Sequence, residues 1–452
     1  MTTDISGRFN YERLLRFALP SVIMLIVISA YSIVDGLFVS NYVGKDAFAA
    51  VNLIYPAIMM FSCVGFMFGS GGSALVAKTM GEGDREKAVR LFSLIVFAAL
   101  FLGLLISGAA YFLIPGLAKF MGAEGDLFEY AVLYGRILLL SLPAFILQRV
   151  FENFLVTAGK PSLGLYITIF SGVINIVLDA LFIIVFPWGV AGAAFATVIS
   201  QLAGGILPFL YFLCKNPTPL RIVRPVFDKG ALIKTCTNGS SELMSNISTS
   251  FVGMVYNYQL MIYAGVNGVA SFGVIMYTAF LFEAVFIGYS MGTAPIISYN
   301  YGARRHDELK SLFKKSLILI SSAGFVLTAL SFIAAPLLAG IFVSYDKELY
   351  DLTVRGFRIF SLSFLFSGFS FYGSAFFTAL NNGIISAVIS LFQSVIFEVI
   401  AVFTLPLFFD TDGIWASVGV ARLAAFLMTC AFWYAFRTVS YTHLRAHETT
   451  LH

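Results

Sequence analysis

Charged residues are scarce in this chain. Only 12% of its 452 residues are Asp, Glu, Lys or Arg, whereas 59% are apolar. A soluble protein carries about a quarter charged residues, so the composition excludes a water-soluble enzyme and a disordered protein. The net charge of +4 is too small to indicate a nucleic-acid partner. Because the apolar excess runs along the whole chain, we predict an integral membrane protein that lies in a lipid bilayer.

Cysteine and histidine are also rare, with four residues of each kind. The cysteines form no CxxC pair, which argues against a disulfide framework or a zinc site. Three of the histidines fall at the end of the chain, so that only His306 remains in its body. The sequence contains no recognisable catalytic constellation. We therefore predict that the protein is not an enzyme and binds no cofactor.

Apolar runs long enough to cross a bilayer recur twelve times. A membrane helix needs about 20 such residues, and no strand pattern competes with this signal. We predict an all-α membrane fold with twelve transmembrane helices. The runs lie approximately at 15–40, 48–76, 90–114, 130–157, 162–186, 189–214, 239–262, 269–299, 312–341, 352–379, 384–408 and 413–437.

Basic residues gather in alternate loops. Lys and Arg cluster at 78–90, 215–234 and 304–315, and about two thirds of them lie on one side if the N-terminus is inside. Because basic loops remain in the cytoplasm, we predict cytoplasmic N- and C-termini. The final segment, 438–452, breaks the composition of the rest, and we interpret it as a non-native, disordered tail.

The chain contains an internal repeat. A shift of 221 residues places Gly44 on Gly265, Gly71 on Gly292 and Gly81 on Gly302. Each half then holds six helices in the same orientation, which is typical of a transporter with a cavity between its halves. The predicted organisation is an N-lobe at 1–214, a cytoplasmic linker at 215–236 and a C-lobe at 237–437.

Several motifs give the chain a resemblance to a known family. They are Pro20 followed by YSIVDGLFV (31–39), VNLIYP (51–56), GEGD (81–84), NGSSELMSNIS (238–248), GVASFGVIMY (268–277) and IGYSMGTAPIISYNYGA (287–303). The chain resembles the multidrug and toxic compound extrusion (MATE) family, in the branch of MepA-type exporters. The resemblance implies two six-helix lobes, a central V-shaped cavity and drug efflux driven by inward Na⁺ or H⁺ flow.

Ionisable side chains within membrane helices are candidates for function, because charge is expensive at that depth. Asp35 and Asp179 lie at similar depths, each about seven residues, or roughly 10 Å, from the outer end of its helix. Asn175 precedes Asp179 by one turn and shares its face. Thr197 reaches the same depth from the sixth helix, and Tyr31 lies one turn from Asp35.

This group of oxygen donors favours cation chemistry. Carboxylate, amide and hydroxyl oxygens suit a hard cation such as Na⁺, and two neighbouring carboxylates can also carry a proton. Polar contacts that merely join helices are the alternative interpretation. The MATE resemblance implies a cation site at the same positions, namely Asp35, Asn175, Asp179 and Thr197, with Tyr31 nearby.

The second half lacks the acidic pair. The repeat places Tyr256 opposite Asp35. Glu398 and Arg422 lie at similar depths, so we predict a neutralising structural ion pair, with a drug-contacting Glu398 as the alternative. Glu283 has no obvious partner, and either a cavity carboxylate that binds organic cations or a structural hydrogen-bonding role would explain it.

Substrate contacts are weakly encoded. Methionine and aromatic side chains adapt to varied ligands and hold cations through their π faces. Together with Glu283, the candidates in the seventh and eighth helices are Met254, Tyr256, Met276, Tyr277, Phe280 and Met291.

We therefore predict a cation-coupled antiporter, monomeric and in a bacterial cytoplasmic membrane, that exports small organic cations by alternating access. Pro20, which removes a backbone hydrogen bond from the first helix, is the predicted hinge. A flippase for lipid-linked precursors and a non-transporting scaffold or sensor are the alternative functions. The anionic substrates of such a flippase would favour a basic cavity, and a scaffold would need no converging carboxylates.

Overall fold

The computed structural model describes residues 5–344 and 346–449, and every regular element within these ranges is helical. Short π-helical segments, labelled η, follow α1, α5 and α11. In chain order the elements are α1 (Tyr11–Phe38), η1 (Val39–Val43), α2 (Lys45–Gly81), α3 (Arg85–Phe120), α4 (Gly125–Thr157), α5 (Pro161–Asp179), η2 (Ala180–Val185), α6 (Gly189–Leu213), α7 (Lys229–Gly302), α8 (His306–Val343), α9 (Lys347–Ser361), α10 (Phe364–Ala379), α11 (Gly383–Leu391), η3 (Phe392–Ile396), α12 (Phe397–Thr404) and α13 (Pro406–Thr449).

The membrane-spanning segments agree with the predicted fold class. Within the described residues, ten helices are long and apolar enough to cross a bilayer, or eleven if the pair α9 and α10, bent by 51°, counts as one span. The long helix α7 is broken at Gly265, whose φ of 59° is non-helical, so it supplies two spans instead of one. This division brings the number to twelve, which confirms the prediction.

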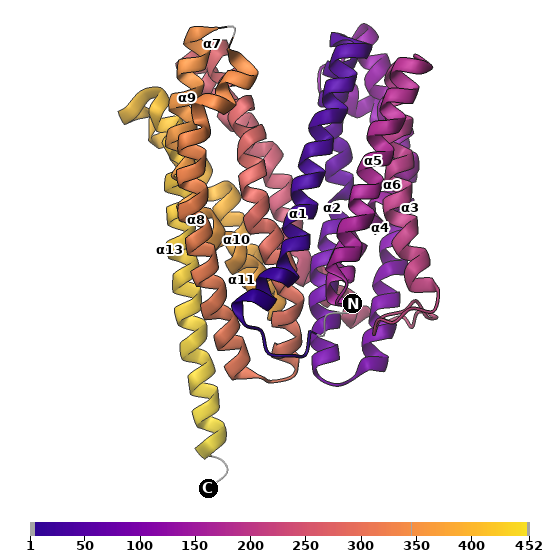
Figure 1. Ribbon diagram of the computed structural model, residues 1–452, viewed down its shortest axis with the longest axis vertical. Coiled ribbons are helices and arrows are strands. Elements are labelled where there is room, and N and C mark those ends of the chain that lie inside the picture. The colour runs from indigo at the N-terminus through magenta and orange to yellow at the C-terminus, as the bar shows by residue number, and fades with distance from the viewer. Residues whose placement is uncertain (1–4, 345, 450–452) are drawn as a thin grey trace.

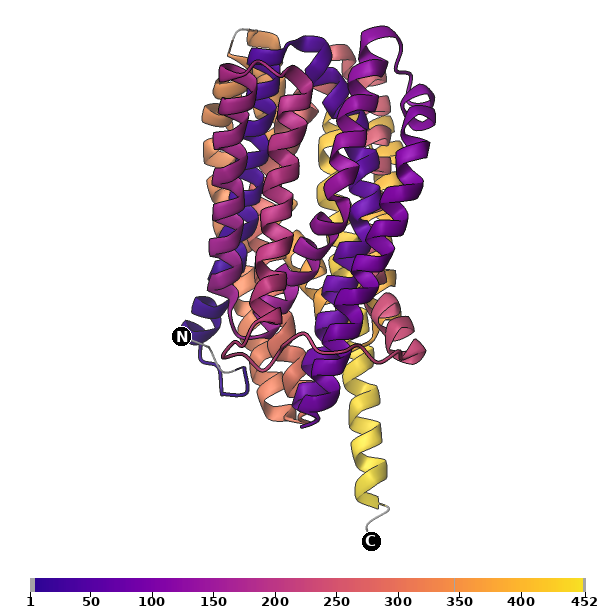
Figure 2. The ribbon, with the colours of Figure 1, turned by 90° about the vertical axis from the view of Figure 1, so that its right-hand side faces the viewer.

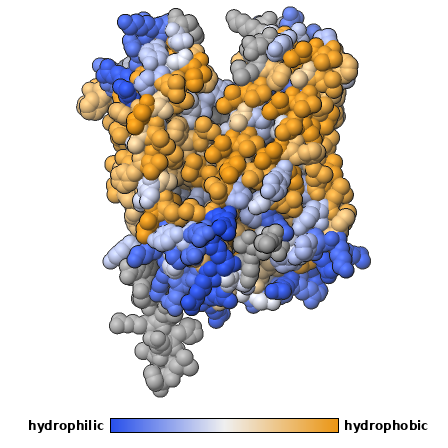
Figure 3. Space-filling view, in the orientation of Figure 1, coloured by the Kyte–Doolittle hydropathy of each residue, from blue (hydrophilic) through white to orange (hydrophobic). Residues whose placement is uncertain are grey.

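The helices form two lobes. Helices α1–α6 lie in one lobe and α7–α13 in the other, and the lobes diverge toward one end (Figure 1). On the face in view, a hydrophobic belt crosses the middle of the molecule, hydrophilic residues gather at its ends, and a notch separates the lobes at the end where they diverge (Figure 3). Helix α1 begins, and α13 ends, at the opposite end (Figures 1 and 2).

Glycines at repeat-related positions let α2 and α7 touch. A Cβ on Gly81 would lie 2.0 Å from the carbonyl oxygen of Tyr299, and a Cβ on Gly302 would lie 2.0 Å from that of Lys78. The same 221-residue shift relates Lys78 to Tyr299 and Gly81 to Gly302. The two contacts are therefore images of one another about a pseudo-twofold axis, and they join the lobes at the end where α1 begins.

Replacing Gly81 or Gly302 by alanine is expected to lower thermal stability. No side chain can rotate away from a Cβ that meets a backbone carbonyl, so the helices must separate, at a cost of about 1–3 kcal/mol. Thermal unfolding of the purified protein in detergent measures the effect. Gly108→Ala is the matched control, because a Cβ there meets nothing within 4 Å. Equal melting temperatures for Gly81→Ala and the control would contradict this close contact.

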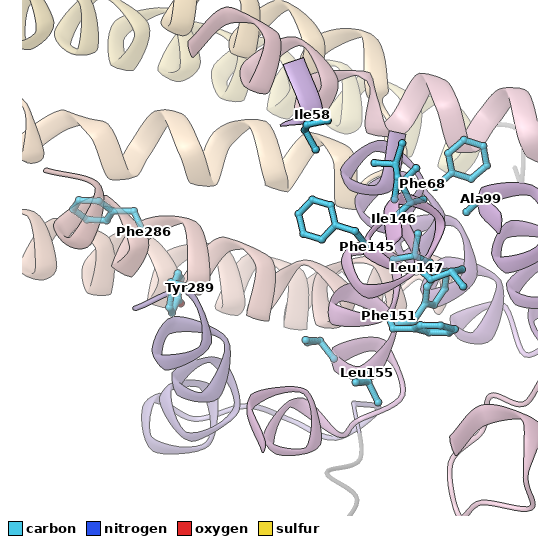
Figure 4. Close-up of a cluster of buried hydrophobic side chains, with 14 of the residues drawn as sticks. Ile58, Phe68, Ala99, Phe145, Ile146, Leu147, Phe151, Leu155, Phe286 and Tyr289 are labelled. Carbon is cyan, nitrogen blue, oxygen red and sulfur yellow. The ribbon is translucent and has the colours of Figure 1, made fainter. Parts of the chain in front are cut away.

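Helix α4 forms the centre of the N-lobe core. Figure 4 shows Phe145, Ile146 and Phe151 of α4 close to Phe68 of α2. The ring of Phe92 on α3 lies 4.8 Å from Phe154 of α4 and 4.9 Å from Phe212 of α6, measured between ring centroids. Since apolar and aromatic packing holds these helices together, the N-lobe forms a rigid frame for the polar residues of α1 and α5.

The structure differs from the sequence-based boundaries in three places. Helix α7 begins at Lys229, because the Asp228 side chain caps it by accepting a hydrogen bond from the amide of Ala231, so the non-helical linker is shorter than 215–236. The predicted helix at 352–379 bends between α9 and α10. There Thr328 of α8 donates a hydrogen bond to the carbonyl of Ser361, and such side-chain bonds accompany helix bends.

The third difference concerns the tail. The sequence predicts disorder over 438–452, whereas α13 continues to Thr449, and 450–452 lie outside the described residues. No glycine or proline follows Gly419, so nothing in the local sequence ends the helix.

Candidate ion and substrate sites

Asp35 and Asp179 approach one another in the N-lobe. Asp35 lies in the last turn of α1, Asp179 ends α5, and a π-helical segment follows each of these helices. The two carboxyl groups are near enough to interact. Asp179 is fully buried, and among the described residues both of its carboxylate oxygens, as well as Oδ1 of Asp35, lack a hydrogen-bond partner. Buried carboxylates without donors are costly unless a cation or a proton neutralises them.

The other predicted donors lie on the same helices or on the neighbouring helix α6. Asn175 is buried one turn before Asp179 on α5. The hydroxyl of Thr197 on α6 donates to the carbonyl of Ala193 at 3.1 Å, which leaves its lone pairs for other contacts. A Cβ on Gly172 would lie only 2.9 Å from Cδ1 of Tyr31, so the glycine makes room for this ring beside α5.

Two tyrosines that the sequence analysis did not select also belong to this region. Tyr134 of α4 is buried beside Thr197 and interacts electrostatically with Asp35 and Asp179. Tyr55 of α2 interacts with Asp35 in the same way. Tyr55 lies within the VNLIYP motif (51–56), but no spacing in the sequence points to either residue among the 21 tyrosines of the chain.

Arg149 and Glu152 of α4 extend the polar region inward. Both side chains are only 8% exposed, so their charges do not reach solvent. Arg149 Nη1 lies 2.9 Å from Glu152 Oε2, and its guanidinium packs against the rings of Phe66 and Phe145. It also interacts with Tyr31, which links this buried pair to the neighbourhood of Asp35.

The C-lobe holds a second buried charge cluster. Arg422 Nη2 of α13 lies 3.4 Å from Oε1 of Glu398 on α12, the partner that the sequence predicts, and 3.5 Å from Oε1 of Glu283 on α7. Glu283 therefore has a partner, unlike the expectation from sequence. The spacing along the chain could not reveal it, because Glu283 and Arg422 lie on different helices, α7 and α13. With both carboxyls ionised, this three-residue cluster has one excess negative charge.

The remaining substrate candidates have different surroundings. Tyr256 is buried, its hydroxyl lies 2.8 Å from Ser417 Oγ, and its ring stacks on Phe272, so it packs within the lobe. The structure leaves Met254, Tyr277 and Phe280 exposed, and Met276 and Met291 partly buried.

Pro20 lies where α1 meets the C-lobe. A Cβ on Gly288 of α7 would lie 2.5 Å from Cα of Val22, and one on Gly292 would lie 2.9 Å from Cα of Ala18. These contacts flank Pro20 on both sides. Farther along, Tyr31 and Asp35 face α5 of the N-lobe, so α1 touches both lobes on either side of its proline.

The N-lobe donor set fits a hard monovalent cation or a proton. Within the described residues no group of three or more His, Cys, Asp or Glu side chains could hold a metal ion. Two carboxylates with an amide and a hydroxyl are oxygen donors of the kind that hard cations prefer, whereas transition metals favour nitrogen and sulfur ligands.

Comparison with known proteins agrees with this architecture. The MatE family model matches residues 20–181 and 243–404, one match in each half. The multidrug export protein MepA of Staphylococcus saprophyticus is 25% identical over 91% of this chain and 89% of its own length, and MepA of Staphylococcus haemolyticus is 25% identical over 92% of each.

Solved structures agree in fold. A crystal structure of MATE in complex with MaL6 superimposes with a TM-score of 0.91 at 23% identity, covering 96% of this chain and 98% of that one. A MOP-superfamily transporter from Pyrococcus furiosus, described as having a binding pocket of reverse polarity, gives a TM-score of 0.90 at 23% identity, with coverages of 97% and 98%. The family model covers most of the chain in two repeats, and the chain therefore belongs to the MatE family of transporters.

Proposed function

We propose that the protein is a cation-coupled antiporter that exports organic cations by alternating access. The observation that carries this proposal is the convergence of Asp179, which is fully buried, and Asp35, which is partly buried, with three carboxylate oxygens that have no hydrogen-bond partner among the described residues. Its Staphylococcus relatives are multidrug export proteins. We also propose that the protein acts as a monomer in a bacterial cytoplasmic membrane, with the end where α1 begins in the cytoplasm, because that end carries the basic loops.

Helix α1 is the proposed coupling element. A Na⁺ or H⁺ that enters between Asp35 and Asp179 removes their mutual repulsion and draws α1 toward α5. The π-helical segments beyond both residues, a form that is frequent at functional sites, adjust to this change. Because α1 packs against α7 on both sides of Pro20, a shift at its outer half changes the contact between the lobes. Cation binding thereby changes the width of the notch between the lobes.

The C-lobe charge cluster is the proposed point of attraction for the drug. With both carboxyls ionised, Glu283, Glu398 and Arg422 bear one excess negative charge, which an organic cation would neutralise. At an effective dielectric constant near 20, a pair 4 Å apart gains about 4 kcal/mol before desolvation. This polarity disfavours an anionic lipid-linked substrate, and two converging carboxylates disfavour a scaffold or a sensor without transport.

Glu283→Gln is expected to reduce the efflux of a cationic dye about tenfold while sparing a neutral substrate of similar size. The substitution removes the excess charge but keeps the shape of the side chain. Initial efflux rates from cells that express equal amounts of protein measure the effect, with the exposed Glu129→Gln as the matched control. If cationic and neutral substrates are lost alike, Glu283 is structural, and the proposed drug site is wrong.

A further inference from the structure

A large basic pocket opens at the end where α1 begins, away from the candidate ion and drug sites. Its volume is about 1670 Å³, and it lies between the start of α1, the start of α5 and the loop that joins α7 to α8. Six basic side chains line it, namely Arg8, Arg13, Arg16, Arg304, Arg305 and Lys315. Three acidic side chains, Glu12, Asp307 and Glu308, oppose them, so the lining has an excess of three positive charges.

The acidic side chains of the pocket do not neutralise all of its basic side chains. Glu12 pairs with Arg16 at 2.7 Å. Glu308 accepts a hydrogen bond from the amide of Phe9 at 2.9 Å, Arg305 donates to the carbonyl of Ser6, and Lys315 donates to that of Phe9. Backbone groups carry no formal charge, so these hydrogen bonds leave the positive excess of the pocket unchanged.

Arg304 occupies a position where the backbone favours glycine. Its φ is 56°, in the left-handed region, and the residue 221 positions earlier, Gly83, has a φ of 91°. A side chain in this conformation costs roughly 1 kcal/mol or more. The first repeat forms the same turn with glycine, without this strain. In the second repeat, the strained residue Arg304 places a guanidinium at the edge of the pocket. Backbone strain of this kind is typical of functional positions.

An exposed apolar stripe continues from the pocket along α1. Glu12 and Arg16 of α1 line the pocket. Leu15, Leu19 and Ile23, which are spaced four residues apart, lie on the same face of the helix and extend away from the pocket. These three side chains are 45%, 53% and 36% exposed. Figure 3 shows the hydrophobic belt of this side meeting hydrophilic residues at the same end. A ligand with a charged head and an apolar tail would match this sequence of surfaces, whereas a free phosphate would leave the stripe uncovered.

We propose that this pocket binds the phosphate of an anionic phospholipid of the cytoplasmic leaflet, whose acyl chain lies along the stripe on α1. Basic pockets between membrane helices bind such headgroups. The pocket is shared by α1 and α5 of the N-lobe and by Arg304, Arg305 and α8 of the C-lobe. The bound phosphate therefore joins the lobes at this end and stabilises the arrangement in which the opposite end is open. The choice of leaflet rests on the orientation given under the proposed function.

The test is thermal unfolding of the purified full-length protein in detergent, with added lipid. Phosphatidylglycerol is expected to raise the melting temperature, whereas phosphatidylcholine and soluble glycerol phosphate are not. In Arg304→Gly/Arg305→Gln the half-maximal phosphatidylglycerol concentration is expected to rise about tenfold, since two charge-assisted hydrogen bonds are lost. Arg304→Gly relieves backbone strain, so the variant should fold, and its melting temperature without lipid reports this directly.

Lys234→Gln, which removes an exposed positive charge from α7 outside the pocket, is the matched control and should respond like the parent protein. If the double variant has the same half-maximal phosphatidylglycerol concentration as the parent protein, the lipid binds elsewhere. If glycerol phosphate raises the melting temperature as much as phosphatidylglycerol does, the pocket binds a free phosphate and not a lipid. If phosphatidylcholine raises it as much, the charge of the headgroup does not determine binding. None of these measurements uses an ion gradient or a drug, so their failure is separate from failure of the proposed antiport.

Discussion

Replacing Asp35 or Asp179 by asparagine is expected to abolish coupled efflux and leave folding and membrane insertion intact. Each substitution removes a negative charge from a pair, Asp179 fully and Asp35 partly buried, whose oxygens have unfilled hydrogen-bonding capacity within the described structure. Folding should survive because the amide is of similar size and removes a buried like-charge repulsion. Dye efflux from energised cells, compared at equal expression, should fall to the level of cells without the transporter.

Asp126→Asn is the control for this experiment, because Asp126 is an exposed acid at the start of α4. It should export dye like the parent protein. Binding provides a second measurement: if Na⁺ is the coupling ion, its affinity should decrease as the pH is lowered, since protons compete for the same carboxylates. Full efflux by either Asp35→Asn or Asp179→Asn would remove the pair from the mechanism.

The second large effect is expected for Arg422→Ala. The guanidinium faces both Glu283 and Glu398, so its removal leaves two buried carboxylates without their cation. Loss of one partner from a buried ion pair typically costs about 3–5 kcal/mol. The melting temperature in detergent should therefore fall strongly. It should recover in part in the double variant Glu398→Gln/Arg422→Ala, and further when Glu283→Gln is added.

Arg355→Ala supplies the matched comparison. Arg355 pairs with Asp412, but its side chain is 68% exposed, and exposed ion pairs contribute only about 0–1 kcal/mol. Its removal should change the melting temperature little. If the losses from Arg422→Ala and Glu398→Gln simply add, the two side chains do not interact, and the charge cluster is not a structural unit.

The fold could be read from the sequence because its signals are local and repeated. Hydropathy locates helices without reference to their packing, and the glycine pattern that relates Gly81 to Gly302 reports a contact that the repeat makes twice. The same reasoning brought Asp35 and Asp179 to one depth. It could do so because depth in a membrane follows from residue count along a helix.

Contacts between distant helices were harder to foresee. The approach of Glu283 to Arg422 depends on how α7 packs against α13, and the proximity of Tyr134 to Thr197 depends on how α4 packs against α6. Neither follows from spacing along one helix. Likewise, Tyr256 matched the pattern of a cavity aromatic, but its hydroxyl contacts Ser417 and its ring stacks inside the C-lobe. The direction in which a side chain points depends on tertiary packing and cannot be predicted from composition.

The central claim is that a cation gradient acting through Asp35 and Asp179 drives export. The most direct measurement is dye transport by the purified protein in vesicles, with Na⁺ and pH gradients imposed one at a time. We expect one of the two gradients to move a cationic dye against its own concentration gradient, and we expect Asp35→Asn to lose this movement. Uphill transport by Asp35→Asn under the same gradient, or dye movement in the parent protein that neither gradient changes, would contradict the account.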